Sequence, residues 1–241
     1  VVNLVRCAWA GTQRHGALVW SGDIASTWES LRAQITAGIH IGVAGIPWFT
    51  TDIGGFHGGH VNDPAFHELL VRWFQFGTFL PIMRLHGDRQ PGTPVTAADG
   101  SQRQPTGAAN EVWSYGEEVY VILREHLLLR EALRDYTRAA MAEAHHDGQP
   151  VMRGVFHGFP DDPVAWTLTD QFLFGPDLLV APVVEPGARS RRVYLPAGAV
   201  WTSLATGERH DGGVWLDVEA PLDAIPVFAR DDRCAHLVSR S

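Results

Sequence analysis

Short apolar runs alternate with stretches of helical spacing through the first part of the chain. Four apolar runs predict strands, at residues 1–9, 17–23, 41–49 and 79–85. Ser26 and Glu29 form an S-x-x-E capping-box pattern, and apolar residues at helical spacing follow it. Asp63 and Pro64 predict the start of another helix, as its N-cap and first-turn proline. This alternation is typical of βα units around a parallel sheet.

The pattern changes after the fourth predicted strand. Residues 86–109 are polar, rich in proline and glycine, and without apolar periodicity, which predicts a long loop. From Asn110, a candidate N-cap, apolar residues follow the helical period as far as His146. Gly148 is a typical residue for the end of such a helix. We therefore expect one long helical region before a domain boundary near Gly148.

Beyond Pro150 the apolar period falls to two. Alternating runs predict strands at residues 151–156, 177–184, 191–196, 199–204, 213–220 and 225–229. Turn-forming glycine, proline and aspartate separate these runs, as in an antiparallel β-sandwich. The predicted fold is therefore α/β in residues 1–148, followed by a β-sandwich domain in residues 149–241.

Composition excludes several classes of function. The formal net charge is −8, without a basic cluster that could neutralise nucleic-acid phosphates. All 19 basic residues are arginine, which excludes Schiff-base chemistry and a P-loop, since both need lysine. No apolar run approaches the roughly 18 residues of a membrane span. Cys7 and Cys234 lie too far apart in sequence for a metal knuckle.

Ionisable side chains follow each of the four predicted parallel strands. They are Arg6, Asp23, Asp52, Arg84 and His86. Each has an ordinary structural explanation: Asp23 could cap a turn, Arg6 could pair with a structural carboxylate, and His86 could be a loop histidine. Taken together, groups at the same ends of consecutive strands favour a functional site, because chemistry gathers at that edge of α/β sheets.

A second cluster of polar residues has metal-like spacing. It comprises His57, His60, Asp63 and His67. These residues fall in a glycine-rich loop and a helix start, where nothing fixes the orientation of the imidazoles. We therefore predict no metal site and no cofactor, and a metal-dependent hydrolase remains the weakest functional hypothesis.

Seven motifs occur in an order that resembles glycoside hydrolase family 31, the retaining α-glycosidases. They are RCAWAGTQR, WSGD, TTDIGGF, RLHG, WSYG, QFLFGPDLLVAPV and VYLP, starting at residues 6, 20, 50, 84, 113, 171 and 193. The resemblance covers nearly the whole chain. It implies the second half of a (β/α)8 barrel, strands five to eight, followed by the β-sandwich.

The resemblance also implies roles for the residues at the strand ends. Asp23 would be the general acid/base. The expected substrate-binding residues, which hydrogen-bond the sugar or wall its site, are Arg6, Trp20, Asp52, Phe56 and His86. An aromatic-lined pocket is expected to raise the pKa of Asp23, so that it holds a proton near neutrality. The family's nucleophile, in a W-x-D-x-N-E motif, has no match in this chain.

Two functional hypotheses therefore remain. The first is a fragment of an α-glycosidase that carries the acid/base and lacks the nucleophile. AWAGTQR and WFTTDIGGF favour an α-xylosidase over an α-glucosidase. The second is a non-catalytic carbohydrate-binding or interaction fragment. The expected partner is an oligosaccharide or α-glycoside, with neither nucleic acid nor membrane, and exposed barrel edges would favour self-association.

Overall fold

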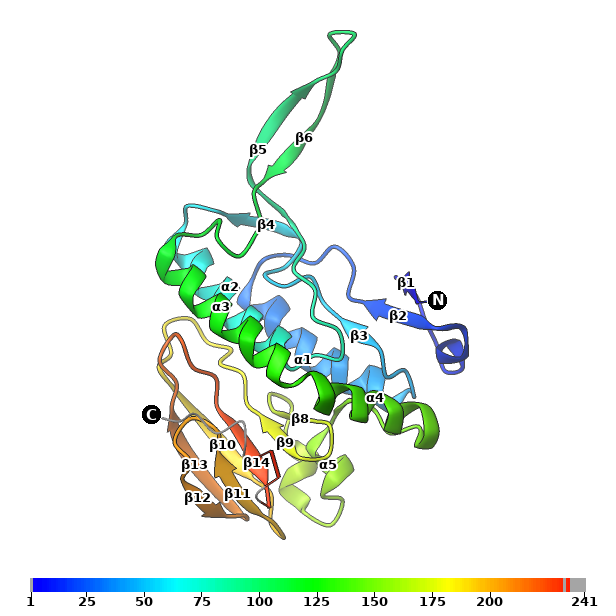
Figure 1. The fold of residues 1–241 in the computed structure, drawn as a ribbon, viewed down its shortest axis with the longest axis vertical. Helices are drawn as coiled ribbons and strands as arrows, with labels where there is room; N and C mark the ends of the chain where they lie inside the picture. Colours follow the sequence, from blue (N-terminus) through cyan, green and yellow to red (C-terminus); the bar gives the residue numbers. More distant parts are fainter. Residues whose placement is uncertain (1, 232, 235–241) are drawn as a thin grey trace.

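The computed structural model describes residues 2–231 and 233–234 (Figure 1). Val1, where the first predicted strand begins, and residues 235–241 of the predicted second domain lie outside this range. The first part contains β1 (Asn3–Val5), η1 (Thr12–His15), β2 (Ala17–Trp20), α1 (Trp28–Val43), β3 (Phe49–Thr50), β4 (His57–His60), α2 (Pro64–Thr78), β5 (Asp88–Thr96), β6 (Gln102–Ala108), α3 (Glu117–Ala132) and α4 (Arg134–Asp147).

A parallel sheet of order β1-β2-β3 begins the fold, as the sequence predicted. Asn3 pairs with Ala17 and Val19 with Phe49, and α1 connects β2 to β3. The prediction of a fourth strand at 79–85 is wrong, because only Leu85 forms an isolated parallel bridge, to Ile53. The segment nevertheless lies along β3, since Ile82 N donates to Phe49 O at 3.3 Å and Ile53 N donates to Arg84 O at 3.2 Å, without forming a continuous ladder.

Two other boundaries differ from the sequence analysis. The predicted strand 41–49 begins three residues inside α1, which runs to Val43, and only Phe49 and Thr50 are extended. The N-cap of α1 is Thr27, whose side chain accepts the Ser30 N–H at 3.1 Å, one residue after the predicted Ser26. The predicted N-cap Asp63 of α2 is confirmed, since it accepts the Ala65 N–H at 2.9 Å.

The segment 86–109 is an ordered hairpin rather than a structureless loop. Strands β5 and β6 pair antiparallel and project away from the rest of the molecule (Figure 1). Of the residues of β5, only Arg89 is buried, so the hairpin has almost no apolar face. Only the start of β5 also pairs with β4, and a ribbon exposed on both faces does not need the period-two alternation that marks a half-buried strand. The sequence analysis therefore missed it.

The predicted long helix is divided in two at Leu133, between α3 and α4. Asn110 does not cap it, since α3 begins only at Glu117, and instead accepts a hydrogen bond from Tyr115. The predicted end at Gly148 is confirmed, with the glycine left-handed at φ +72°. None of the helices in the described part of the chain combines the length and apolarity that a membrane crossing requires.

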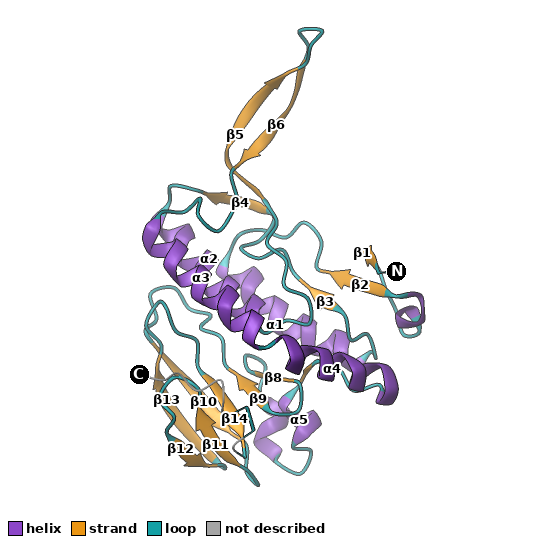
Figure 2. Ribbon diagram, viewed as in Figure 1, coloured by secondary structure: helices purple, strands orange, loops and turns teal. Residues whose placement is uncertain are grey.

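Antiparallel sheets form the second part of the chain (Figure 2). Its elements are β7 (Met152–Arg153), α5 (Val155–Gly158), η2 (Pro163–Thr167), β8 (Phe172–Phe174), β9 (Leu178–Val180), β10 (Ser190–Leu195), β11 (Val200–Ser203), β12 (Arg209–Asp211), β13 (Val214–Glu219) and β14 (Val227–Arg230). One sheet has the order β12-β11-β14-β9-β8-β7, and β10 pairs with β13 in the other. The predicted strand 151–156 ends early because α5 begins at Val155, and β8 and β12 were not predicted.

The two parts share one apolar core. Edge-to-face ring pairs join them, with centroids 5.8 Å apart for Phe76 and Phe172 and 6.0 Å apart for Phe79 and Phe174. Arg72 of α2 is fully buried between the parts and donates to the Ala220 and Ala224 carbonyls at 2.7 and 2.8 Å. The antiparallel part thus holds in place the side of α2 that carries Arg72.

Asp162 is the polar centre of the second part. Its carboxylate accepts hydrogen bonds from Val164 N–H at 3.0 Å, Tyr194 Oη at 2.8 Å and Ala197 N–H at 3.0 Å. Burial alone would raise the pKa of Asp162, but these hydrogen bonds outweigh it and the pKa is lowered. Burial and the bond to Asp162 raise the pKa of Tyr194 to about 12.

We expect Asp162→Asn to lower the free energy of unfolding by about 2 kcal/mol at pH 7, because the NH2 group of the new side chain would face the N–H and O–H donors that the carboxylate now accepts from. The lowered pKa means that the carboxylate stabilises the fold above about pH 4, the unfolded value. That contribution is lost as the pH falls through the folded pKa, so the variant should lose less stability on acidification. Urea unfolding at pH 7 and pH 3, followed by far-UV circular dichroism, measures both effects. Equal pH dependence of the two proteins would contradict this assignment.

Candidate active site

Three loops meet at the carboxyl ends of the parallel strands: residues 21–26 after β2, 51–57 after β3, and 84–89. Backbone hydrogen bonds join the loops in pairs. They run from Phe56 N to Ile24 O (2.7 Å), Ser26 N to His57 O (2.8 Å), Ile53 N to Arg84 O (3.2 Å) and Asp88 N to Phe56 O (2.8 Å). Every residue that the sequence placed at this edge, except Arg6 after β1, lies on one of these loops or just before it.

Asp23 and Arg6 form an ion pair at the solvent-facing side of this edge. Arg6 Nη2 lies 2.6 Å from Asp23 Oδ2, and the two side chains are 57% and 41% exposed. The Arg6 guanidinium also lies 5.5 Å from the centre of the Trp20 ring. The structure therefore brings together the predicted acid/base and two of the predicted sugar contacts.

The electrostatic setting of Asp23 differs from the expectation. The hydrogen bond from Arg6 lowers the pKa of Asp23, and the positive charges of Arg6, His57 and His86 act in the same direction. Burial would raise the pKa of Asp23, but this carboxyl is 41% exposed, so the contacts with Arg6 dominate. In this structure Asp23 is thus held as a carboxylate rather than as a carboxylic acid.

Asp52 lies on the same edge but beneath the surface. Its side chain is fully buried and pairs with Arg84, which is 26% exposed. Burial raises the pKa of Asp52, and the Arg84 charge opposes this shift. Asp52 Oδ2 has no hydrogen-bond partner in the part of the chain that the structure describes. Asp52 therefore faces Arg84, and Arg84 is the member of the pair that reaches solvent.

Phe56 and His86 bring an aromatic surface to the site. Their ring centroids are 5.5 Å apart, and His57 stands edge-on to Phe56 at 4.7 Å. Phe56 is half-buried, whereas both histidines are exposed. A ring with one covered and one open face is suited to packing against a sugar.

One glycine explains how closely two of the loops approach. Gly55 has φ +76°, and a Cβ there would lie 2.7 Å from Ala25 O and from Ser26 N. Only glycine allows the D-I-G-G-F loop to lie against the loop that carries Asp23. The double glycine thus serves the relative placement of Asp23 and Phe56.

The histidine-rich cluster does not converge on a point. His57 and His60 lie on β4, Asp63 caps α2, and a ring nitrogen of His67 lies 2.7 Å from the Val61 carbonyl. Among the residues that the structure describes, no group of three or more His, Cys, Asp or Glu side chains is arranged to hold a metal ion.

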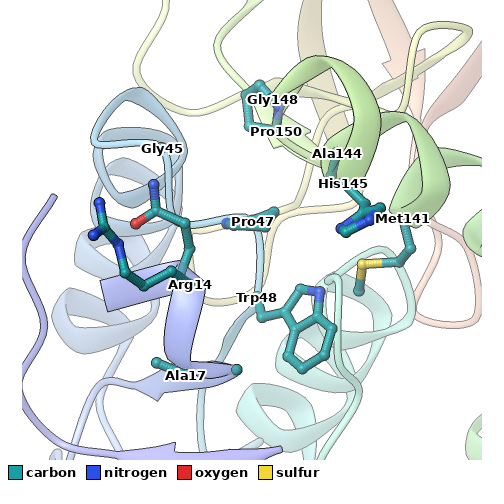
Figure 3. Close-up of a pocket in the computed structure, with 12 residues that line it drawn as sticks. Arg14, Ala17, Gly45, Pro47, Trp48, Met141, Ala144, His145, Gly148 and Pro150 are labelled. Atoms are coloured by element: carbon teal, nitrogen blue, oxygen red, sulfur yellow. The ribbon is translucent and has the colours of Figure 1, made fainter. Parts of the chain in front are cut away.

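A cavity of about 580 Å³ lies at the opposite ends of the strands (Figure 3). Ala17 at the start of β2 and Trp48 before β3 line it, together with Met141 and His145 of α4. None of the predicted site residues lines this cavity. We therefore place the candidate site at the loop edge, where the ionisable groups meet.

The sequence analysis missed some polar groups that support these loops. Ser21 Oγ donates to Thr51 Oγ1 at 3.1 Å, which joins the first two loops. Arg89 is fully buried beside all three loops, in a segment that the sequence analysis treated as a loop. The glycines of the neighbouring motifs could have indicated such a group in the sequence, because a glycine often marks a position where another part of the protein packs closely against the backbone.

Known proteins provide the comparison for this arrangement. The glycosyl hydrolases family 31 TIM-barrel domain matches residues 1–140, and the glycosyl hydrolase family 31 C-terminal domain matches residues 148–234. An alpha-xylosidase of Saccharolobus solfataricus is 36% identical over the whole chain, which covers 30% of that relative. Alpha-glucosidase 2 of Bacillus thermoamyloliquefaciens is 35% identical over 94% of the chain and 26% of its own length.

Solved structures agree with these matches. A GH31 alpha-xylosidase from a soil metagenome, complexed with xylose, superposes with a TM-score of 0.94 at 57% identity, over 99% of this chain and 36% of that one. The chain therefore spans between about a quarter and a third of the length of these three relatives. The two family models follow one another along the sequence, in the same order as the parallel and antiparallel parts of the fold. The resemblance seen in the motifs is thus confirmed, and the chain belongs to glycosyl hydrolase family 31.

Proposed function

We propose that these residues are the part of a retaining α-glycosidase that carries the general acid/base, Asp23. The observation that supports this most directly is the meeting of Asp23 with Arg6, Trp20, Phe56 and His86 at one edge of the parallel sheet. A carboxyl group, hydrogen-bond donors and aromatic faces are the groups that glycoside cleavage needs.

The proposed chemistry has two steps. In the first, the Asp23 carboxyl donates its proton to the glycosidic oxygen as its bond to the anomeric carbon breaks, and a second carboxylate attacks that carbon. In the second, Asp23 takes a proton from water, whose oxygen displaces the enzyme carboxylate at the anomeric carbon. Two displacements return the original configuration.

The substrate-binding roles follow from exposure. Arg6 and His86 are exposed and carry donors for sugar hydroxyls, and Trp20 and Phe56 offer aromatic faces. Asp52 is buried, so we assign it an indirect part: it orients the Arg84 guanidinium toward the sugar. Hydrogen bonding and ring packing of this kind require neither a metal nor a cofactor.

We further propose that residues 1–148 supply positions five to eight of a (β/α)8 barrel, with β1, β2 and β3 at the first three and the segment 79–85, which bridges Ile53 through Leu85, at the fourth, and that residues 149–241 supply the domain that follows it. The attacking carboxylate then belongs to the remaining barrel strands. In support, the chain spans about a third of its relatives and contains no W-x-D-x-N-E motif. A non-catalytic carbohydrate-binding role is the alternative that the missing motif favours.

For the substrate we propose an α-xyloside in preference to an α-glucoside. The support is the name of the Saccharolobus relative and the 57% identity to the soil-metagenome alpha-xylosidase that binds xylose. A site that separates sugars by one small group does so by about 1–3 kcal/mol. The preference should therefore be a ratio of rates rather than complete exclusion.

In a longer protein that contains this chain and the W-x-D-x-N-E segment, Asp23→Ala should lower kcat/KM about 10³-fold on poor leaving groups and spare kcat/KM on activated aryl glycosides. On the activated substrates kcat should still fall, because the second step loses its base. Only the poor leaving groups need a proton. Azide should restore turnover of the activated substrate and yield the α-glycosyl azide, detected by NMR. Asp63→Ala is the matched control, since that carboxylate only caps α2. Equal losses on both substrates without azide rescue would mean that Asp23 is not the acid/base.

The Arg6–Asp23 pair predicts a pH effect in the same protein. Arg6 favours the carboxylate of Asp23, so Arg6→Ala should raise the pKa of the acid. The alkaline limb of kcat/KM should then move to higher pH, because the proton is retained longer. Arg14→Ala, which removes an exposed arginine far from the site, should leave the limb in place. A limb that stays or moves to lower pH in Arg6→Ala would contradict the pairing.

Residues 1–241 alone should self-associate and show no measurable turnover of aryl α-xylosides or α-glucosides. Strand β1 pairs on one side only, with β2, and Val2 and Leu4 beside that edge are 53% and 44% exposed. Light scattering and both assays test this, with the longer protein as the active comparison, in which the α-xyloside should react faster. A monomer that hydrolyses either substrate at about 1 per second or more would show that a second carboxylate in this chain is the nucleophile.

A further inference from the structure

Arg89 lies at the centre of the three loops without being part of any motif assigned a role. Its side chain is fully buried. Nη2 donates to the carbonyls of Ile53 and His86 at 2.9 and 3.3 Å, and Nη1 donates to Gly55 O at 2.8 Å. Nη1 also donates to Ser26 Oγ at 3.3 Å. One guanidinium therefore contacts the loop after β2, the loop after β3 and the segment that carries His86.

The glycines of two motifs make room for this guanidinium. A Cβ on Gly54 would lie 2.8 Å from Arg89 Nη2, and one on Gly87 would lie 2.6 Å from Arg89 Cζ. Distances this short do not occur in folded proteins without displacement of one group. The first glycine of D-I-G-G-F and the glycine of R-L-H-G thus both leave room for one arginine side chain.

The other side of Arg89 is held by neutral groups. Its Nε donates to Asn110 Oδ1 at 3.1 Å and to Tyr115 Oη at 3.3 Å, and its guanidinium lies 5.0 Å from the Phe66 ring centre. No Asp or Glu of the described chain forms an ion pair with it. The groups that bind the guanidinium directly are therefore neutral carbonyl, amide and hydroxyl oxygens, and its donors are not available to a substrate.

We propose that Arg89 is the positioning residue that holds the acid/base loop, the aromatic loop and the His86 segment in one reactive arrangement. This inference rests on the proposed glycosidase function. Arg89 acts through backbone atoms: it fixes the carbonyls on either side of Phe56 and of the Asp52–Arg84 pair, and through Ser26 the loop of Asp23. It touches neither sugar nor reacting atoms.

Arg72 provides a matched control within the same chain. It too is fully buried, and it donates to carbonyls of the antiparallel part instead of the site loops. Lysine cannot replace either fork of donors, because it offers one nitrogen in place of three. Arg89→Lys and Arg72→Lys should therefore cost similar stability, and only the former should loosen the site.

The test uses the longer protein that contains this chain, assayed on aryl α-xylosides well below its unfolding temperature. Arg89→Lys should lower kcat by about 100-fold, the loss expected for a displacement near 1 Å, whereas Arg72→Lys should stay within about threefold. Hydrogen exchange of peptides covering 50–58 and 84–90 should quicken about tenfold in Arg89→Lys alone. Tyr115→Phe, which removes one acceptor of Arg89, should give a smaller loss of the same kind.

The outcomes separate the two proposals. Equal kcat in Arg89→Lys and Arg72→Lys, or faster exchange without loss of kcat, would overturn the positioning role while the glycosidase function stands. An unaltered protein that hydrolyses neither an α-xyloside nor an α-glucoside would overturn the function, and with it the catalytic meaning of Arg89. Should Arg89→Lys fail to fold, Tyr115→Phe decides alone, and wild-type kcat and exchange in it would overturn the proposal.

Discussion

Arginines that donate to backbone carbonyls hold this fold together at its three main junctions. Arg72 joins α2 to the antiparallel part, Arg89 joins the site loops, and Arg130 of α3 donates to the carbonyls of Thr78 and Leu80 at 2.7 Å each. Burial lowers the pKa of both Arg72 and Arg130 to about 10, so both stay charged at neutral pH. These contacts are costly to disturb, because removal of the arginine leaves several buried carbonyls unpaired.

The protonation state of Asp23 connects this part of the fold to the proposed chemistry. Arg6 keeps the carboxyl ionised in this structure, whereas a general acid must carry a proton before cleavage. Like charges close together raise a pKa, so an attacking carboxylate on the remaining barrel strands would oppose Arg6. On the proposed mechanism, that second carboxylate therefore has two effects: its charge raises the pKa of Asp23 before cleavage, which favours the protonated acid, and it then attacks the anomeric carbon.

Much of this organisation could be predicted from the sequence, and the exceptions have physical causes. Asp63, Gly148 and the order of parallel and antiparallel parts were predictable, because local capping and apolar periodicity determine them. The hairpin β5–β6 was not, since its stability comes from cross-strand bonds that leave no apolar pattern. The burial of Asp52 was equally hidden, because its partner Arg84 lies 32 residues away in sequence.

The shortness of the parallel strands explains why the site depends on so few side chains. Strand β3 has 2 residues and β2 has 4, so the hydrogen bonds between the strands do not fix the positions of the loops that follow them. The loops that follow must then be placed by other contacts, which are the backbone bonds of Phe56, the close packing at Gly55 and the donors of Arg89. Glycine at such a position is therefore selected by what approaches it rather than by its own φ alone. In this chain, the glycines of the two motifs leave the space that the Arg89 side chain fills, so the loop geometry depends on both.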